Sequence, residues 1–140
     1  MLSLEDIQGF VYELGIAEAG RVYIGKLDSK KEKSIGIYNR RATGSPIMAL
    51  GGWDYTSYAI RRISFLVHWN RDKAEAEEAA WKLYQKLLTQ SSLYIRETFI
   101  SCLVLQVPEP QDVGTDDDGV YEYVIWADFI YQKDKQGKDV

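Results

Sequence analysis

The chain of 140 residues is 46% hydrophobic, 13% aromatic and 27% charged, a composition that excludes a disordered protein and suits one domain with a hydrophobic core. Its formal net charge of −4 disfavours a general nucleic-acid binder, so we expect no sequence-specific nucleic-acid partner. No run reaches the roughly 18 consecutive apolar residues of a membrane span, and the acidic start MLSLEDIQGF differs from a basic signal peptide. We therefore expect a protein without a membrane partner that is made and used in a cytosol.

The first part of the chain predicts a short amphipathic helix followed by two strands. Ser3 and Asp6 suit the reciprocal hydrogen bonds of a helix N-terminus, and Gly15 supplies a stop. Between them, apolar side chains recur at helical spacing: Ile7, Phe10, Val11 and Leu14. Residues 21–27 and 34–39 are rich in β-branched and aromatic residues, and the polar segment DSKKEK between them predicts a hairpin with a charged tip.

The segment GSPIMALGGWD, residues 44–54, is unusually apolar for a connection between strands. Its large apolar side chains surround a pair of glycines: Ile47, Met48, Leu50 and Trp53. One interpretation is a wide hairpin connection whose apolar residues fold back on their own domain. The other is a long flexible loop that buries these side chains against another subunit.

The second half of the chain predicts a strand, a helix and two further strands. Residues 55–69 read as a strand with apolar side chains on both faces, so we expect both faces to be covered. The helix that opens at Asp72 carries an apolar stripe and an order of charges that suits its dipole. Residues 99–107 are almost continuously apolar, which predicts a central strand. After the acidic loop QDVGTDDDG, residues 120–131 alternate between one apolar face and one face with acidic residues.

The predicted order of elements is therefore α-β-β-β-α-β-β. This order indicates an α+β fold with a mostly antiparallel sheet and a long helix packed on one face. We expect a single domain over residues 1–132, followed by a mobile polar tail over residues 133–140.

The sequence shows no group of residues at the spacing expected of an enzyme or of a metal site. Its one histidine, His68, and its one cysteine, Cys102, fall in different predicted strands and do not form a catalytic triad. His68 has no cysteine or acidic residue at ligand spacing, so we expect it to pack in the core or at an edge, and Cys102 to be a small buried hydrophobic residue. The glycines and aspartates match neither a phosphate loop nor a calcium-binding loop. We therefore predict no catalytic residue, no cofactor and no metal ligand.

Two clusters of opposite charge stand out. The basic cluster lies on and after the predicted first hairpin and comprises Lys30, Lys31, Lys33, Arg40 and Arg41. The acidic cluster precedes the last strand and comprises Asp112, Asp116, Asp117 and Asp118. Both clusters can simply keep the surface soluble. The alternative is that the basic end of one copy meets the acidic loop of the next, which would arrange copies head to tail and close them into a ring.

The order of elements and the run from SIGIYNRRATGSPIMALGGWDYTSY to WNRDKAEAEEAAWKLYQKL resemble the tail terminator proteins of long-tailed bacteriophages and prophages, also called tail completion or minor capsid proteins. The likeness extends across most of the chain. It rests on a strand that ends in IGIY, a glycine-containing loop with the aromatic exit GGWDYTSY, a strand with the paired arginines Arg61 and Arg62, and an Asn-Arg-Asp lead into an alanine-rich helix.

The resemblance implies a small, non-enzymatic protein that forms a hexameric ring on the head-proximal end of the tail tube and stops tube polymerisation. Its partners would be further copies of the chain, the major tail tube protein and a head connector protein. It would lie at the head-tail joint of a virion assembled in the cytoplasm of a bacterial host. In that setting the apolar residues of the 44–54 segment would become buried against a neighbouring subunit or against the tube.

Two other functions stay open at the level of sequence. A head-completion or connector adaptor protein would share the ring symmetry but bind the portal assembly. A small-molecule-binding or hydrolytic α+β domain would need a perturbed acid, Glu122 or Asp128, in a concave pocket with an aromatic lining. That lining would consist of Tyr23, Tyr121, Tyr123 and Trp126.

Overall fold

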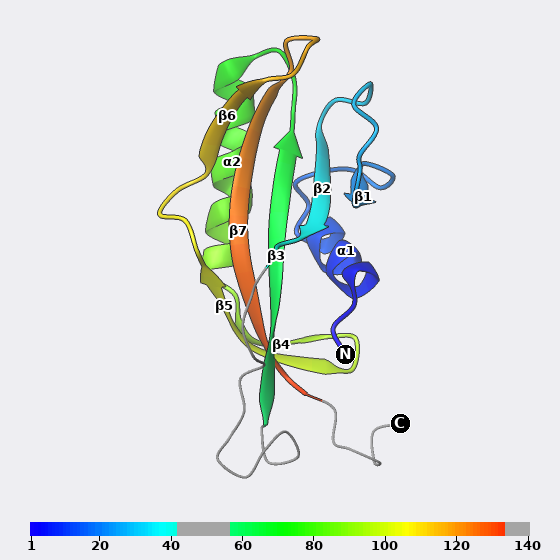
Figure 1. The fold of residues 1–140 in the computed structure, drawn as a ribbon, viewed down its shortest axis with the longest axis vertical. Coiled ribbons are helices and arrows are strands. Elements are labelled where there is room, and N and C mark those ends of the chain that lie inside the picture. Colours follow the sequence, from blue (N-terminus) through cyan, green and yellow to red (C-terminus); the bar gives the residue numbers. More distant parts are fainter. Residues whose placement is uncertain (42–56, 134–140) are drawn as a thin grey trace.

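The computed structural model describes residues 1–41 and 57–133 (Figure 1). Within these ranges the elements are α1 (Leu4–Glu13), β1 (Val22–Ile24), β2 (Ser34–Asn39), β3 (Tyr58–His68), α2 (Lys73–Leu88), β4 (Ser91–Ile95), β5 (Thr98–Leu105), β6 (Gln111–Thr115) and β7 (Tyr121–Gln132). The predicted apolar contact residues Ile47, Met48, Leu50 and Trp53 lie outside the described residues, as do residues 134–140 of the predicted tail.

The seven described strands join one sheet in the order β1-β2-β3-β7-β5-β4, and β6 also pairs with β7. At the centre, β3 and β7 pair over their whole length, from Tyr58 opposite Gln132 to His68 opposite Glu122. β6 pairs with the first part of β7 and β5 with the later part. Every pairing except that of β1 with β2 is antiparallel within the described strands. The structure thus confirms the α+β class and the mostly antiparallel sheet.

β1 and β2 are parallel, so the predicted hairpin over these strands is wrong. Val22 lies opposite Ile35, and both strand arrows point the same way in Figure 1. A parallel pair usually needs a longer crossover, but β1 has only three residues and residues 25–33 suffice to carry the chain back. Positive φ angles of 72° at Gly25 and 56° at Lys33 allow the tight changes of direction. A polar connecting segment suits either arrangement, which is why composition did not distinguish them.

Two strands and the length of the second helix also differ from the prediction. β4 was not predicted, and β6 occupies the start of the predicted acidic loop. All five residues of β6 are exposed, so this strand forms by backbone pairing with β7 and carries no apolar pattern. The expected long helix is not borne out: α2 has only 16 residues, because it is capped at Asp72 and ends at Thr89.

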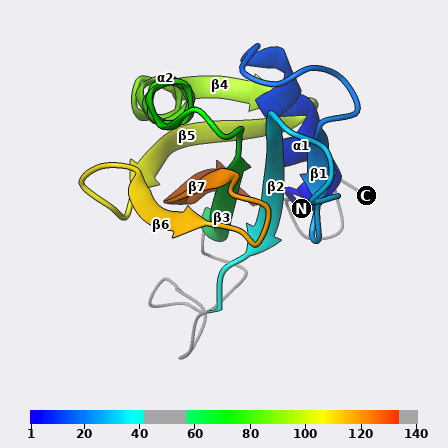
Figure 2. The ribbon, with the colours of Figure 1, turned by 90° about the horizontal axis from the view of Figure 1, so that it is seen from above.

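One face of the sheet, the inner face, carries the core and both helices (Figure 2). Alternate residues of the central strands point to it; Phe65 of β3 lies opposite Ile125 of β7, and both are fully buried. The Phe129 ring on the same face contacts Phe10 of α1 and Phe65, with ring centroids 5.9 and 6.3 Å apart. α2 adds a stripe of buried side chains: Ala76, Ala79, Ala80, Leu83, Tyr84 and Leu87. The core therefore lies between the helices and the centre of the sheet.

Both helices begin with the caps that the sequence predicts. The Ser3 hydroxyl accepts a hydrogen bond from the backbone N–H of Asp6, and the Asp6 carboxylate accepts one from the backbone N–H of Ser3, each at 3.1 Å. The Asp72 carboxylate accepts from the backbone N–H groups of Ala74 and Glu75. Neither described helix is both long enough and apolar enough to cross a membrane.

Candidate functional site

The opposite face of the sheet, the outer face, carries no helix in the described part of the chain (Figure 2). Three large side chains on it are exposed: Trp126 to 43%, Val104 to 42% and Tyr58 to 39%. Ile60 and Ile130, which lie opposite one another in β3 and β7, are half-buried beside them. These five residues form what we call the outer-face patch. Within β3, the expectation that both faces are covered therefore holds on the inner side but only in part on the outer side, where Tyr58 is exposed, the side chains up to Leu66 are half-buried and His68 is buried.

An ion pair borders the outer-face patch. Arg40 donates from Nη2 to Oδ1 of Asp128 and from Nη1 to the carbonyl oxygen of Ile63, the latter over 3.3 Å. The other carboxylate oxygen of Asp128 accepts from the side-chain amide of Gln106 at 3.1 Å. The Arg40 guanidinium also lies 5.3 Å from the ring centroid of Trp126, a cation–π arrangement. Arg40, predicted to be part of a charged interface, is thus engaged within its own chain.

An open hollow of about 350 Å³ adjoins the outer-face patch where β3 begins and β7 ends. It is lined by Ser57, Tyr58, Phe99, Ser101, Ile130 and Gln132. The lining combines aromatic, aliphatic, hydroxyl and amide groups and contains no acid, base or thiol. Such a surface suits contact with another protein better than acid–base chemistry. Cys102 lies in a strand, β5, as expected, but it is half-buried where a buried side chain was expected.

The other predicted charged residues fall mainly at one end of the molecule (Figure 1). Exposed lysines lie in the β1–β2 connection: Lys30, Lys31 and Lys33. Asp116, Asp117 and Asp118 lie in the β6–β7 turn at the same end, and only Asp116 is partly buried. Asp112 lies in β6 with its carboxylate 3.5 Å from Nζ of Lys73, and Arg41 is exposed after β2. The three lysines and the aspartates of the turn therefore lie at the same end of one chain, whereas Arg40 and Arg41 lie at the other end of β2.

His68 links these two charged segments and is fully buried. Its Nδ1 lies 2.8 Å from Oε2 of Glu122 and 3.8 Å from Oδ2 of Asp116, and its Nε2 lies 3.0 Å from the carbonyl oxygen of Ser29. The burial of His68 agrees with the expectation that it packs inside the fold, but the spacing in the sequence does not indicate its two acidic neighbours. Glu122 is 54 positions away in the chain but directly opposite His68 in the β3–β7 pairing. The contact between His68 and Glu122 depends on the register of β3 with β7, which the sequence alone does not reveal.

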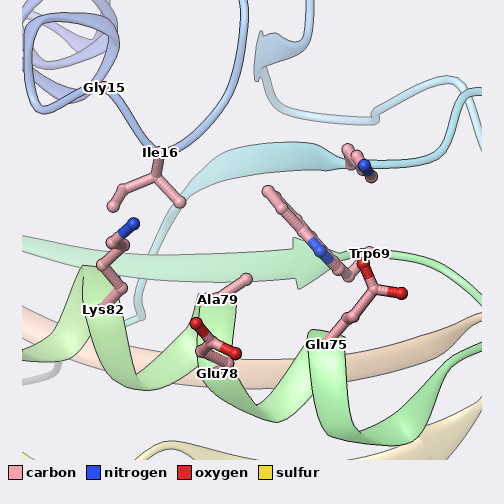
Figure 3. Close-up of a pocket in the computed structure, with 8 residues that line it drawn as sticks. Gly15, Ile16, Trp69, Glu75, Glu78, Ala79 and Lys82 are labelled. Atoms are coloured by element: carbon pink, nitrogen blue, oxygen red, sulfur yellow. The ribbon is translucent and has the colours of Figure 1, made fainter.

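A second hollow, of about 190 Å³, lies between α2 and the segment after α1 (Figure 3). Glu75, Glu78 and Lys82 of α2 line one side, with Ile16 and Trp69 across from them. Glu78 and Lys82 stand four positions apart, the spacing at which opposite charges stabilise an exposed helix. These features suit a solvated helix face better than a ligand site.

The aromatic pocket required by a small-molecule-binding domain is not formed by the described residues. Tyr123 lies on the inner face with 3% of its surface exposed, whereas Trp126 lies on the outer face, so the sheet separates them. Burial, with a smaller effect of the Asp112 charge, raises the pKa of the Tyr123 hydroxyl, and this hydroxyl has no hydrogen-bond partner among the described residues. The two candidate acids, Glu122 and Asp128, are each paired with a basic side chain.

The family described as "Bacteriophage tail terminator protein" matches residues 4–133. The chain belongs to this family. The match spans both helices and every described strand, so it covers the inner core and the outer-face patch alike. No curated protein and no solved structure matches the chain significantly.

Membership of the family confirms the resemblance seen in the sequence. Tail terminators are structural proteins of bacteriophages and do not form a class of enzymes. The membership therefore indicates a structural component of a virion.

Proposed function

We propose that this tail terminator forms a ring, hexameric when assembled, on the head-proximal end of the tail tube. The ring would stop the addition of tube subunits and offer the head connector a surface for joining. The protein would then lie at the head-tail joint of a virion assembled in the cytoplasm of the bacterial host. The family match over residues 4–133 is the observation that carries this proposal. No enzymatic step is part of it, because subunit contacts alone can cap a tube.

The contact with a neighbouring subunit or with the tube is assigned to the outer-face patch. Exposed aromatic side chains such as Trp126 and Tyr58 are enriched at the centres of protein interfaces. The connection 42–56 leaves the described fold after Arg41, next to the Arg40–Asp128 pair, and returns at Ser57, next to Tyr58. Its apolar residues belong to a segment that starts and ends beside this patch: Ile47, Met48, Leu50 and Trp53. Patch and segment together would supply one apolar contact surface.

Charge pairing between adjacent copies would orient the subunits in the ring. The β1–β2 connection, with the exposed Lys30, Lys31 and Lys33, lies at the same end of the molecule as the β6–β7 turn, with the exposed Asp117 and Asp118. A ring contact at this end would place the lysines of one copy beside the aspartates of the next. Arg40 has no such role in the proposal, because Asp128 already binds it.

The patch assignment is tested with Trp126→Ala and a matched control, Trp81→Ala. Trp81 lies on α2, is exposed to 37% against 43% for Trp126, and is far from the outer face. Each variant is supplied from a plasmid to a phage that lacks the gene, and joined virions are counted by electron microscopy. The melting temperature of each purified variant shows whether it is folded.

The proposal predicts that Trp126→Ala stays folded but restores few joined virions, whereas Trp81→Ala restores them fully. Equal restoration by both variants would remove the outer-face patch from the proposed interface. Failure of both variants despite normal folding would show that the surface of α2 is needed as well.

A further inference from the structure

We propose that His68, Asp116 and Glu122 bind a divalent metal ion, with Zn²⁺ as the ion that the site fits. The residues come from the end of β3, the β6–β7 turn and the start of β7. One ligand atom from each side chain lies within 4.8 Å of the other two. The site uses no residue of the outer-face patch and none of the charged residues assigned to the ring contact. Its test therefore does not depend on whether the ring forms.

The spacing of the three ligand atoms suits a tetrahedral ion. Nδ1 of His68 lies 2.8 Å from Oε2 of Glu122 and 3.8 Å from Oδ2 of Asp116. Zinc bonds of about 2.0 to 2.2 Å in a tetrahedron place neighbouring ligand atoms about 3.3 to 3.6 Å apart. The two separations from Nδ1 bracket this range, and the two carboxylate oxygens lie within 4.8 Å of one another, so side-chain rotations would complete the site. One imidazole and two carboxylates would leave the fourth position to water.

The surrounding structure orients both the imidazole and the aspartate toward this point. Nε2 of His68 donates to the carbonyl oxygen of Ser29 at 3.0 Å, which leaves Nδ1 for the ion. A backbone carbonyl on the second ring nitrogen is the usual support of a metal-binding histidine. Oδ1 of Asp116 accepts from the backbone N–H groups of Asp118 and Val120, each at 2.9 Å, while Oδ2 faces the imidazole.

Burial and charge also fit a cation. The His68 side chain is fully buried, whereas the side chains of Asp116 and Glu122 are 18% and 20% exposed, so an ion would enter from the carboxylate side. A neutral imidazole with two carboxylates carries two negative charges, which a divalent ion neutralises.

A bound ion would tie together three segments of the charged end. Ser29 belongs to the β1–β2 connection, His68 to β3, and Asp116 to the β6–β7 turn. Because these segments would separate on unfolding, zinc should bind the folded chain in preference and raise its melting temperature.

The test uses untagged protein, because a histidine tag would itself bind zinc. His68 is the only histidine of the chain, so the ¹⁵N NMR signals of the imidazole report on this site alone. Zinc chloride is titrated into the wild type and into Asp116→Asn, Glu122→Gln and Asp117→Asn, and the affinity is measured by competition with a colorimetric chelator. Asp116→Asn retains Oδ1 for the turn, and Asp117→Asn is the matched control at an exposed neighbouring position.

The proposal predicts one zinc ion per chain, a large shift of the Nδ1 signal and a zinc-dependent rise in melting temperature. Asp116→Asn and Glu122→Gln should each weaken zinc binding by about tenfold or more, and Asp117→Asn should leave it unchanged. An unshifted Nδ1 signal in folded wild type with excess zinc would overturn the proposal and leave His68 as an ion-pair partner only. Equal zinc affinity in all four proteins would overturn it too. If Asp116→Asn or Glu122→Gln fails to fold, the shift of the wild-type Nδ1 signal by itself decides whether the site binds zinc.

Discussion

Arg40 and Asp128 form an ion pair on the outer face of the sheet, although 88 positions separate them in the chain. The pair joins the end of β2 to the middle of β7 and lies beside the exposed Trp126. The two side chains are only 15% and 11% exposed, so water screens them weakly. The pair therefore holds the chain against the sheet immediately before the connection 42–56.

Replacing Asp128 by alanine should destabilise the fold. The change leaves the Arg40 guanidinium shielded without its acceptor and removes the partner of Gln106. We expect the free energy of unfolding to fall by about 3 kcal/mol, since removal of one partner from a buried ion pair leaves an uncompensated charge. Urea denaturation measures the free energy of unfolding. Asp117→Ala serves as the control at an exposed acidic residue and should change this free energy by less than about 0.5 kcal/mol. Equal effects of the two changes would show that the pair does not contribute to stability.

The two faces of the sheet should respond differently to truncation. Phe129→Ala removes a fully buried ring that contacts Phe10 and Phe65, and should cost about 3 to 5 kcal/mol. Val104→Ala on the exposed outer face should cost less than about 1 kcal/mol, because it leaves no cavity. Chemical denaturation of both variants provides the comparison. A large loss for Val104→Ala would mean that something covers the outer face in the isolated chain.

The cap of α1 should contribute measurably to stability. Ser3→Ala removes the hydroxyl that accepts from the backbone N–H of Asp6, and we expect a loss of about 1 kcal/mol. Ser3→Asp keeps a side-chain acceptor for the cap, so its loss of stability should be much smaller. Thermal denaturation of the two variants distinguishes the cap from a general effect of the position. Equal losses for alanine and aspartate would contradict a capping role.

Tyr123 should make the fold sensitive to alkaline pH. Burial raises the pKa of its hydroxyl in the folded chain, whereas an unfolded tyrosine titrates near pH 10. The contribution of Tyr123 is therefore fully present below about pH 10 and is lost as the pH rises toward the folded-state pKa, because the unfolded chain releases a proton that the folded chain retains. Tyr123→Phe should lose less unfolding free energy than the wild type between about pH 9 and about pH 11. Parallel losses in urea denaturation at these pH values would contradict this assignment.

The centre of the fold could be predicted from the sequence because its signal is local. Alternation along residues 120–131 places Ile125, Ala127 and Phe129 on one face, and all three are fully buried. The helix caps at Ser3 and Asp72 were also predicted, since each depends on residues only two or three positions away. The parallel β1–β2 pair was not predicted, because it depends on the path of the connection between the two strands. β6 was not predicted either, because it forms by backbone pairing and has no side-chain pattern.

The site residues were harder to predict because they depend on register and on exposure. Glu122 reaches His68 only through the β3–β7 pairing, and Asp116 only through the geometry of the following turn. The alternation of residues 120–131 places Trp126 on the face of Glu122 and Asp128, but it does not show that the ring is exposed. Val104 occurs in a continuous apolar run, in which an exposed residue looks the same as a buried one. Family resemblance, in contrast, could be recognised from the sequence, because it draws on many positions at once.

The most direct test of the proposed function is electron microscopy of lysates from a phage that lacks this gene, with and without the protein supplied from a plasmid. A tail terminator that caps the tube predicts filled heads beside unjoined tails of abnormal length, and joined virions of normal length when the plasmid is present. Normal-length tails beside heads that leak DNA would assign the protein to the head side of the joint, and intact virions without the plasmid would contradict both roles.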